Sequence, residues 1–471
     1  MKQAALVCIE EACGARYGID ERIYVCPLCA GLLEIRKEPE SIGDASALRA
    51  VWTSRLTSPD ALDQSGVWRY RELLPFTDEA QVVSLAEGNT PLYDAMRAAR
   101  YCGLDALKLK HQGCNPTGSF KDTGMTVAVT QALKLSARTV VCASTGNTAA
   151  SLAAYAARAR LSCAILVPRG QVSHAKLAQS LDYGAMVLEL EGGFDDAMRL
   201  IRELAEDESI YLVNSINPFR IEGQKTVAAE LVQQLGWRVP DHLVVPGGNL
   251  GNSSAFGKGL IELLELGLID RLPKIHVVQA AGAAPFANLF AAQPLEIQSL
   301  NHQPLEAQHL ESSAFETLLP VAFPQTLATA IQIGAPVSWR KALRVVRRTG
   351  GRVLSVSEQE MADAKAIIGR DGVGCEPASA TTIAGIRQLV ADGAIGPNEE
   401  VVAVLTGHVL KDTDYVINYH NDELFAHERD ADGSINKRRI AGRYANPPAR
   451  VKANSADILE YLRQRRKEGD E

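Results

Sequence analysis

The sequence predicts an α/β fold built on mainly parallel sheets. From about Val82 to Asp412, short runs rich in β-branched residues, such as RTVVCAS, SCAILVP and EVVAVLTG, alternate with alanine-rich amphipathic stretches such as TAASLAAYAARA. Alternation of strand and helix along a chain is typical of parallel sheets joined by crossover helices. Several strand runs are apolar at nearly every position, which is expected when helices cover both faces of a sheet.

Composition and charge narrow the class of protein. The 471 residues include 49 lysines and arginines against 56 aspartates and glutamates, a formal net charge of −7. A nucleic-acid-binding protein would usually show a basic excess, so no nucleic-acid partner is predicted. No apolar run is long and charge-free enough to span a bilayer, and the N-terminal stretch does not continue as a secretory signal would. A cytoplasmic protein with no membrane partner is therefore predicted.

The first segment, up to about Pro75, differs from the rest of the chain. Four of the nine cysteines gather there in two pairs, Cys8 with Cys13 and Cys26 with Cys29. Two cysteine pairs at short spacing are typical of a zinc ribbon, in which four thiolates close a tetrahedral structural site. A zinc-ribbon-like module with a structural zinc ion is predicted over residues 1–36. The first pair is spaced more widely than usual, so four reduced cysteines in a small β module remain the alternative.

The stretch HQGCNPTGSFKDTGM places one lysine between a predicted strand and a predicted helix. The turn and cap residues from Asn115 to Ser119 put Lys121 in the first turn of that helix. The positive end of the helix dipole favours the neutral amine, which is the form that attacks an aldehyde to make a Schiff base. A helix-start lysine that faces solvent is the alternative, and for this stretch alone it is the stronger one.

Three further strand–helix junctions carry polar or glycine-rich loops, and in parallel sheets such loops gather at the edge where ligands bind. CASTGNTAAS offers hydroxyls and N–H groups to a carboxylate, and VVPGGNLGNSSAFGKG has the form of a phosphate cradle. VAVLTGHVLKD ends a strand at Thr406, whose hydroxyl suits a ring nitrogen. Taken singly, the loops are also explained as helix caps and turns. Together they predict pyridoxal 5′-phosphate, which combines an aldehyde, a phosphate and a ring nitrogen.

Seven blocks of the sequence resemble, in the same order, the threonine synthase family of pyridoxal-phosphate enzymes with the tryptophan-synthase-β type fold. The blocks are NPTGSFKDTGM, ASTGNTAAS, NSINPFRIEGQKT, VPGGNLGN, ATAIQIGAPVSW, CEPASATT and LTGHVLKD, and they span roughly residues 85–412. NSINPFRIEGQKT separates this family from the wider superfamily. The resemblance implies a fold of type II with two open, twisted sheets. It also implies a lyase that converts O-phospho-L-homoserine and water to L-threonine and phosphate.

The resemblance also implies roles for individual residues. Lys121 is expected to hold the cofactor as a Schiff base and to move protons at the substrate's Cα and Cβ. The other expected cofactor contacts are Phe120 beside the ring, Asn147 at the 3′-oxygen, Thr406 at the ring nitrogen, and the backbone of Gly247, Gly248, Asn249, Leu250 and Gly251 at the phosphate. A neutral hydroxyl at the ring nitrogen implies a nitrogen that is unprotonated or weakly protonated. The expected substrate contacts are Ser144, Thr145 and Thr148 at the amino-acid end and Asn214, Ser215 and Arg220 at the phosphate.

The same resemblance implies the organisation of the chain. Residues 37–125 and 222–412 are expected to form a large cofactor domain, residues 126–221 a small inserted α/β domain, and residues 413–471 a C-terminal tail. Closure of the small domain over substrate would exclude water until it is needed. A homodimer is expected because the family is commonly dimeric. The segment AAQPLEIQSLNHQPLEAQHLESSAF breaks the alternation and is predicted to be an irregular surface insertion.

Two alternatives stay open from the sequence. One keeps the cofactor and changes the reaction: cysteate synthase, which uses phosphoserine with sulfite, or a threonine or serine dehydratase. The other is a non-catalytic binding protein that has kept the fold of an enzyme. Phosphate release from O-phosphohomoserine tests the first alternative, and the visible colour of the purified protein, lost in Lys121→Ala, tests the second.

Overall fold

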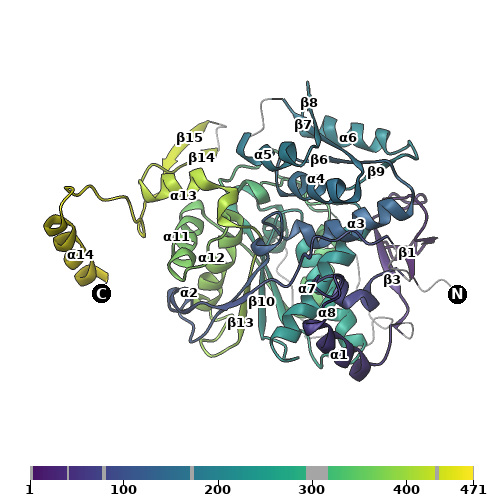
Figure 1. The fold of residues 1–471 in the computed structure, drawn as a ribbon, viewed down its shortest axis with the longest axis horizontal. Helices are drawn as coiled ribbons and strands as arrows, with labels where there is room; N and C mark the ends of the chain where they lie inside the picture. Colours follow the sequence, from purple (N-terminus) through teal and green to yellow (C-terminus); the bar gives the residue numbers. More distant parts are fainter. Residues whose placement is uncertain are drawn as a thin grey trace.

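The chain forms a body of two sheets with a small module near its N-terminus and a projecting helix near its C-terminus (Figure 1). The computed structural model describes residues 4–39, 42–76, 81–169, 174–292, 317–429 and 434–469. The predicted surface insertion falls almost entirely outside these residues.

The larger sheet has six strands in the order β12-β11-β10-β13-β5-β4. Neighbouring strands are parallel except β4 and β5, which are antiparallel. In chain order the strands are β4 (Leu92–Asp94), β5 (Lys108–His111), β10 (His242–Pro246), β11 (Lys274–Ala280), β12 (Val353–Val356) and β13 (Val401–Leu405). The predicted parallel architecture is therefore confirmed for this sheet, with an antiparallel strand at one edge.

Helices cover both faces of the larger sheet. They are α1 (Ala45–Ser54), α2 (Met96–Cys102), α7 (Pro218–Gln234), α8 (Gly251–Glu265), α9 (Pro285–Ala292), α10 (Trp339–Thr349), α11 (Glu358–Arg370) and α12 (Pro377–Ala391). Strand β13 has both faces buried: Val402 and Val404 pack with α1, α7 and α8, whereas Ala403 and Leu405 pack with α2, α11 and α12. This explains why the strand is apolar at every position. Short 3₁₀ helices complete the body: η2 (Arg55–Thr57), η3 (Trp68–Leu73), η4 (Gln112–Cys114), η5 (Ala281–Ala283), η8 (Thr329–Ile331) and η9 (Val409–Lys411).

The smaller sheet has four parallel strands in the order β8-β7-β6-β9. The strands are β6 (Thr139–Ala143), β7 (Ser162–Pro168), β8 (Met186–Leu190) and β9 (Ile210–Leu212), and the helices that accompany them are α3 (Lys121–Lys134), α4 (Asn147–Ala159), α5 (His174–Asp182) and α6 (Phe194–Leu204). All four strands lie inside the predicted small domain. Helices α3 and α7, however, each run across one of its predicted boundaries, so the domain limits remain a prediction.

The N-terminal module is a three-stranded antiparallel sheet, β2-β1-β3, made of β1 (Ala4–Cys8), β2 (Arg16–Gly18) and β3 (Leu33–Lys37). It docks on α8 and α10. Lys258 of α8 donates to the carbonyl of Ile35 at 2.5 Å, and Lys341 of α10 donates to the carbonyl of Leu33 at 2.7 Å. At the start of α10, the backbone N–H of Ser338 donates to the carbonyl of Asn249, in the loop after β10, at 3.2 Å. Helix α10 therefore contacts both the module and that loop.

A buried cluster of charges lies beneath this contact. Lys225 of α7 pairs with Glu222 at 2.6 Å and with Glu262 at 2.7 Å, and Lys258 pairs with the same two carboxylates at 2.8 and 2.9 Å. Buried charges are tolerated only when they are paired and hydrogen-bonded. The cluster gives Lys225 a structural place, away from the ligand cavity described below.

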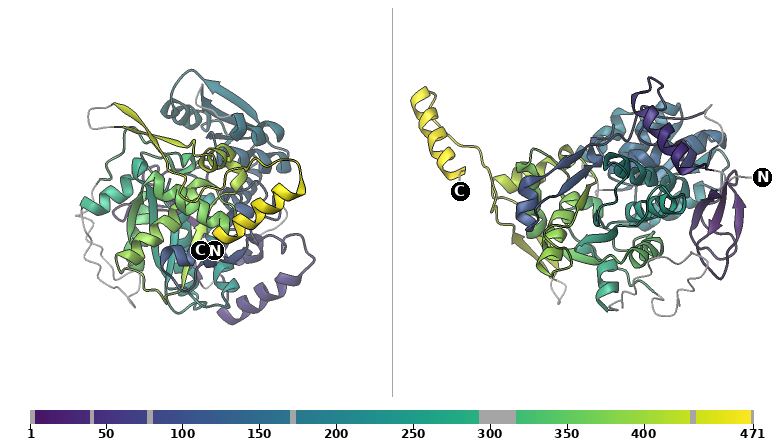
Figure 2. Two further views of the ribbon diagram at one scale, coloured as in Figure 1. Left: turned by 90° about the vertical axis from the view of Figure 1, so that its left-hand side faces the viewer. Right: turned by 90° about the horizontal axis from the view of Figure 1, so that it is seen from below.

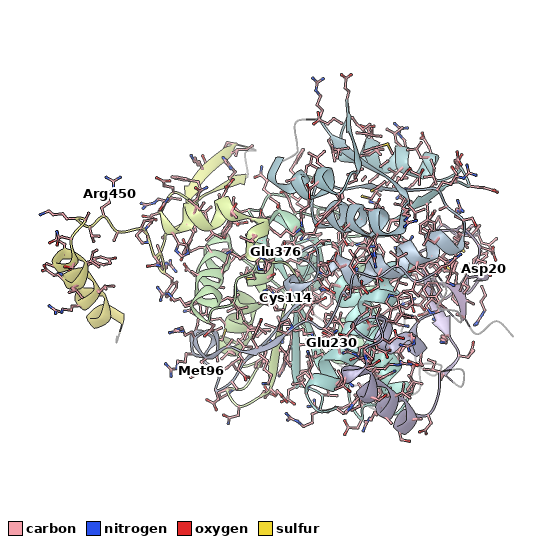
Figure 3. The ribbon with its side chains drawn as sticks, in the orientation of Figure 1. Asp20, Met96, Cys114, Glu230, Glu376 and Arg450 are labelled. Carbon is pink, nitrogen blue, oxygen red and sulfur yellow. The ribbon has the colours of Figure 1, made fainter. Side chains whose placement is uncertain are left out.

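The C-terminal part carries α13 (Thr413–His420), the antiparallel pair β14 (Phe425–Arg429) and β15 (Ile435–Arg439), and α14 (Ser455–Gly469). Figure 1, the right-hand view of Figure 2 and Figure 3 show α14 standing away from the body, beyond a segment that includes Arg450. Among the helices that the structure describes, none has the length and apolarity that crossing a membrane requires.

Candidate active site

Loops that follow strands of both sheets line one cavity of about 2040 Å³. It lies between the two sheets, where β5, β10 and β13 of the larger sheet and β6 and β9 of the smaller sheet end. Pockets for a single small ligand usually measure about 300–1000 Å³, so this cavity has room for a cofactor and a substrate together. Of the predicted cofactor and substrate residues, these line it: Phe120, Lys121, Ser144, Thr145, Asn147, Thr148, Asn214, Ser215, Arg220, Gly248, Asn249, Leu250, Gly251 and Thr406.

Lys121 begins α3, and a buried aspartate holds the loop that leads to it. The carboxylate of Asp122 accepts from the backbone N–H of Thr117 at 2.7 Å, from the Thr117 hydroxyl at 2.6 Å and from the Ser151 hydroxyl at 2.5 Å. Burial is the main reason that the pKa of Asp122 is raised to about 6. These contacts explain why so many turn residues precede one lysine, because they fix the point at which the helix starts.

The amine of Lys121 is unusually easy to deprotonate. Burial in the cavity wall, followed by repulsion from Arg220, lowers the pKa of Lys121 to about 7, although Glu376 opposes the shift. The amine lies over the ring of Phe120, with 4.0 Å between the nitrogen and the ring centroid. At neutral pH a large fraction of this amine is therefore the neutral, nucleophilic form.

The glycine-rich loop after β10 brings backbone donors to the cavity. Leu250 has φ +62° and occupies the left-handed region, which is rare for a residue with a side chain and is typical of strained functional loops. Helix α8 begins directly after it, and the N–H groups of a helix's first turn have no acceptor within the helix. Such a terminus is well suited to a phosphate group.

Gly247 departs from the sequence prediction. Its backbone N–H donates to the carbonyl of Val278 at 2.7 Å, and Gly247 is not part of the cavity wall. A Cβ atom there would lie 2.7 Å from a methyl of Val277 and 2.8 Å from Gln279. Glycine is needed at 247 because β11 packs against it, so its predicted phosphate contact has no free donor.

Several side chains that line the cavity carry buried polar atoms without hydrogen-bond partners among the described residues. Arg220 is 5% exposed, and neither its Nε nor its Nη1 has a partner among the described residues. The same holds for Oε1 of Gln224 and for both amide atoms of Asn252. All three residues line the cavity. Leaving a buried charged donor unpaired costs free energy, so the guanidinium of Arg220 is suited to bind an anionic ligand.

Asn214 and Ser215 reach the cavity with their polar groups already engaged. The Asn214 amide exchanges two hydrogen bonds with the backbone of Ala143, at 3.0 and 3.1 Å, which ties the end of β9 to the end of β6. The hydroxyl of Ser215 accepts from the amide of Asn249 at 3.0 Å. Asn214 thus joins two strand ends of the smaller sheet, whereas Ser215 joins a loop of the smaller sheet to the loop after β10 of the larger one.

Comparison with known proteins identifies the family. The pattern of the family described as "Pyridoxal-phosphate dependent enzyme" matches residues 83–407. A threonine synthase from Methanocaldococcus jannaschii is 45% identical over 406 residues, which are 86% of this chain and 93% of that protein. Threonine synthase 2, chloroplastic, from Arabidopsis thaliana is 37% identical over 463 residues, which are 96% of this chain and 83% of that protein. The chain belongs to the threonine synthase family.

Solved structures of more distant enzymes share the fold of this threonine synthase family member. A fungal L-serine ammonia-lyase from Rhizomucor miehei aligns with a TM-score of 0.58 at 20% identity, over 72% of this chain and 99% of that one. A processed threonine deaminase from Solanum lycopersicum aligns with a TM-score of 0.55 at 19% identity, over 78% and 85%. At these identities the likeness concerns the fold, which is the predicted fold type II.

The residues of the cavity fit the cofactor of the family. The cavity wall includes Lys121, an amine with a lowered pKa, and the start of α8 with the loop at Gly248. The cavity also carries the side chains of Asn147 and Thr406, which suit the polar atoms of a pyridine ring. The donor set therefore matches an aldehyde, a phosphate and a ring with hydrogen-bonding atoms at its edge.

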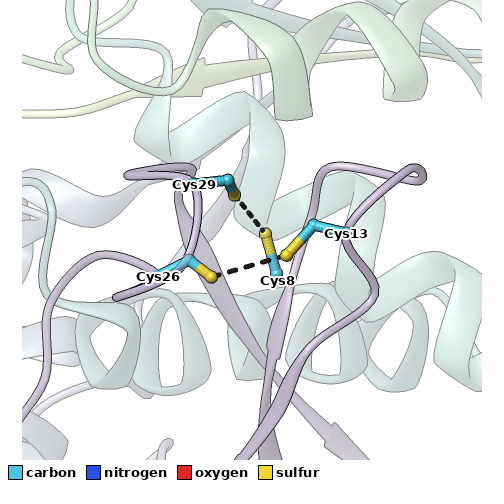
Figure 4. A group of neighbouring side chains, drawn as sticks. All are labelled: Cys8, Cys13, Cys26 and Cys29. Carbon is cyan, nitrogen blue, oxygen red and sulfur yellow. Dashed lines mark hydrogen bonds between the residues drawn. The ribbon is translucent and has the colours of Figure 1, made fainter.

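The four cysteines of the N-terminal module come together (Figure 4), and none of them lines the cavity. The sulfurs of Cys8 and Cys29 lie 3.4 Å apart, those of Cys13 and Cys26 lie 3.6 Å apart, and all four lie within 4.8 Å of one another. Four sulfurs each about 2.3 Å from a zinc ion form a tetrahedron with edges of roughly 3.8 Å. The predicted cluster of thiols is thus formed, and its geometry is compatible with a closed structural site.

Sequence reasoning missed Glu376, Gln224 and Asn252, all of which line the cavity. Glu376 belongs to the block CEPASATT, and it directly precedes the proline that starts α12. Glutamate is not among the residues preferred at an N-cap, and in the structure the Glu376 side chain makes no capping hydrogen bond. The residue type at this position was therefore a signal that the carboxylate serves another element. Gln224 and Asn252 lie on helices, where a polar residue carries no signal of its own.

Proposed function

We propose that this protein is a threonine synthase, a pyridoxal-phosphate-dependent lyase that converts O-phospho-L-homoserine and water to L-threonine and phosphate. The observation that carries the proposal is a cavity with two places for a phosphate group, in a chain whose relatives are threonine synthases. One place is the start of α8. The other is the unpaired guanidinium of Arg220.

Two anion sites suit a reaction in which the cofactor and the substrate each carry a phosphate. The backbone donors after Gly248 would hold the phosphate of the cofactor. Arg220 would hold the phosphate of the substrate, since a planar guanidinium can bind two phosphate oxygens at once. Ser144, Thr145 and Thr148, at the start of α4, would bind the substrate's carboxylate.

Bound pyridoxal phosphate would supply an electron sink for the charge that develops when a substrate proton is removed. Lys121 would hold the cofactor's aldehyde carbon before substrate arrives. Once released, its amine would take the proton from the substrate's Cα and then move protons at Cβ, which suits a pKa near neutral pH. Arg220 would stabilise the phosphate as it leaves from Cγ, and the cavity walls would keep water away until it adds at Cβ.

The decisive assay compares substrates on the purified protein. We expect O-phospho-L-homoserine to give inorganic phosphate and L-threonine in equal amounts. O-phospho-L-serine with sulfite, L-threonine alone and L-serine alone are the matched alternatives. Turnover of phosphoserine with sulfite in place of phosphohomoserine would assign the protein to cysteate synthesis, and ammonia release from the free amino acids would assign it to the dehydratases. A colourless protein that takes up no pyridoxal phosphate would be a binding protein.

A structural zinc ion in the N-terminal module is part of the proposal. We expect purified protein to contain about one zinc ion per chain, held by the four thiolates. Cys29→Ser should lose the zinc and lower the melting temperature, because metal binding in a small module is part of its folding free energy. Cys114→Ser, which changes an exposed cysteine outside the cluster, is the control and should keep the zinc. Equal zinc content in both variants would exclude the site.

The homodimer and the cytoplasmic location remain predictions that follow from the family and the sequence. Sedimentation velocity of the purified protein tests the first, and cell fractionation tests the second. The predicted closure of the small sheet over bound substrate also remains a proposal. Its support is the position of the cavity between the two sheets.

A further inference from the structure

The N-terminal module contacts the smaller sheet as well as the larger one. Its loop between β2 and Cys26 lies beside β9 and the end of α3 (Figure 1). Arg22 of this loop donates to the carbonyl of Leu135 at 2.8 Å, and the amide of Gln131 in α3 donates to the carbonyl of Ile19 at 2.8 Å. Because the module also docks on α8 and α10, it connects elements that belong to both sheets.

Strand β9 is an edge strand, and the module supplies partners for its outer backbone groups. The strand is the last in the order β8-β7-β6-β9, so one of its sides has no neighbouring strand. Leu212 donates its backbone N–H to the phenolic oxygen of Tyr24 at 2.8 Å, and the carbonyl of Ile210 accepts from Arg22 at 3.3 Å. Unpaired backbone groups on a buried edge cost free energy, and a loop that covers the edge removes this cost.

Tyr24 also packs its ring against this strand. The ring centroids of Tyr24 and Tyr211 lie 5.7 Å apart with an interplanar angle of 59°, within the range in which aromatic pairs attract each other. Tyr24 also packs against the apolar core of the smaller sheet, which includes Val141 and Leu212. The contact therefore has two parts, a ring that packs and a hydroxyl that accepts, and a substitution can separate them.

Leu212 is also held through its carbonyl, by the residue that caps α7. The carbonyl of Leu212 accepts from the side-chain amide of Asn217 at 2.8 Å. The side-chain oxygen of the same asparagine accepts from the backbone N–H of Phe219 at 3.0 Å and so caps the helix. The backbone N–H of Asn217 donates to the carbonyl of Asn214 at 3.0 Å, which closes the turn between β9 and α7.

This turn and the helix after it carry the residues proposed to bind the substrate's phosphate. Asn214 and Ser215 lie within the turn, and Arg220 lies in the first turn of α7. All three line the cavity, whereas Tyr24 is not part of the cavity wall. A shift of Leu212 would therefore move all three side chains relative to the rest of the cavity.

We propose that Tyr24 is a positioning residue for the substrate's phosphate group. Its hydroxyl fixes Leu212, and Leu212 in turn fixes the turn that carries Asn214 and Ser215 and the start of the helix that carries Arg220. The inference rests on the proposed function, because it takes these three residues as the phosphate contacts. It gives the N-terminal module a part in substrate binding.

Tyr24→Phe tests the proposal, because it keeps the ring and removes the acceptor of the Leu212 N–H. In the full-length protein with bound cofactor and no substrate, we expect the backbone amides of residues 210–217 to exchange with deuterium about 2- to 10-fold faster, the effect of losing one neutral hydrogen bond. The KM for O-phospho-L-homoserine should rise by a similar factor with little change in kcat, because a displaced phosphate site weakens substrate binding.

Tyr70→Phe is the matched control. The hydroxyl of Tyr70 donates to the side-chain oxygen of Gln233 at 2.6 Å, among the helices of the larger sheet, and neither residue lines the cavity. This variant also loses one tyrosine hydrogen bond, so its effect on overall stability should resemble that of Tyr24→Phe. Exchange in residues 210–217 and the KM should stay unchanged.

Two results would overturn the proposal. Unchanged exchange in residues 210–217 of Tyr24→Phe would mean that the hydroxyl does not fix the turn. Faster exchange there with an unchanged KM would mean that Tyr24 supports the strand without acting on the phosphate site. If Tyr24→Phe folds poorly, Arg22→Met removes the module's other hydrogen bond to β9 and should give the same two changes.

The outcome can be separated from that of the proposed function. Deuterium exchange and a calorimetric titration with inorganic phosphate both proceed without turnover. A protein that makes no threonine, yet shows faster exchange and weaker phosphate binding in Tyr24→Phe, would refute the proposed function and support the role of Tyr24. Threonine formation with unchanged exchange and KM in Tyr24→Phe would refute the role of Tyr24 alone.

Discussion

Replacing Lys121 with alanine is expected to abolish activity. Threonine formation should fall by at least about 10³-fold, since a positioned acid–base group alone contributes 10²–10⁴-fold and the covalent hold on the cofactor is lost as well. The visible absorbance of the purified protein should disappear, because Lys121, whose pKa is lowered to about 7, is the amine that would hold the cofactor's aldehyde. Absorbance spectra and phosphate release measure the two effects.

The control for this experiment is Lys108→Ala. Lys108 lies at the surface end of β5, where it pairs with the exposed Asp94 at 2.6 Å. Its loss should leave the absorbance and the rate unchanged. A visible band that persists in Lys121→Ala would mean that another amine holds the cofactor, which would remove the central residue of the proposed site.

Replacing Arg220 with methionine is expected to raise stability and lower activity at the same time. The substrate phosphate would lose charged hydrogen bonds worth about 1.5–3 kcal/mol, so kcat/KM should fall roughly 10- to 150-fold. In the substrate-free protein the guanidinium is buried with two unpaired nitrogens, and burial lowers the pKa of Arg220 to about 10. Removing an unpaired buried charge should increase the free energy of unfolding by about 1–3 kcal/mol.

Steady-state kinetics and denaturant unfolding of the substrate-free protein provide these two measurements. Arg238→Met is the matched control, because Arg238 follows α7 on the surface and makes one exposed pair with Glu400 at 3.5 Å. It should change neither quantity appreciably. A loss of stability in Arg220→Met with unchanged kinetics would mean that Arg220 supports the fold and does not bind substrate.

The strand-end loops could be predicted because apolar strand runs are followed by polar or glycine-rich loops, and because such loops gather at one edge of a parallel sheet. Strand β13 is apolar throughout, and Thr406 follows it directly; the largely apolar strand β10 likewise ends just before the glycine-rich loop at Gly247 and Gly248. In parallel sheets, the ends of such strands meet at one edge, which is why residues 285 positions apart, Lys121 and Thr406, line one cavity. Local pattern and sheet topology together were therefore sufficient to bring these loops to one edge, whereas the roles of single residues came from the family resemblance.

Pairings between distant elements could not be predicted in this way. No local signal tells that the carboxyl group of Glu376 fills the space beside Gly407, or that Gly247 is a glycine for the sake of β11. The buried pairs of Lys225 and Lys258 with two glutamates could not be predicted either, because in the sequence each of these residues looks like an ordinary charged position on a helix. Such contacts depend on which helix faces meet, and a single sequence does not contain that information.

The docking of the N-terminal module has a consequence for how the chain acquires its structure during synthesis. The carbonyl of Leu33 is held by Lys341, 308 residues later in the chain. At about 5–20 residues per second, the ribosome needs roughly 15–60 s to deliver that lysine. Segments of fewer than about 40 residues rarely stay folded without a metal or another crosslink. If the four cysteines hold zinc, the metal would therefore contribute most during synthesis. It would stabilise the N-terminal module until α8 and α10, on which the module docks, have been made.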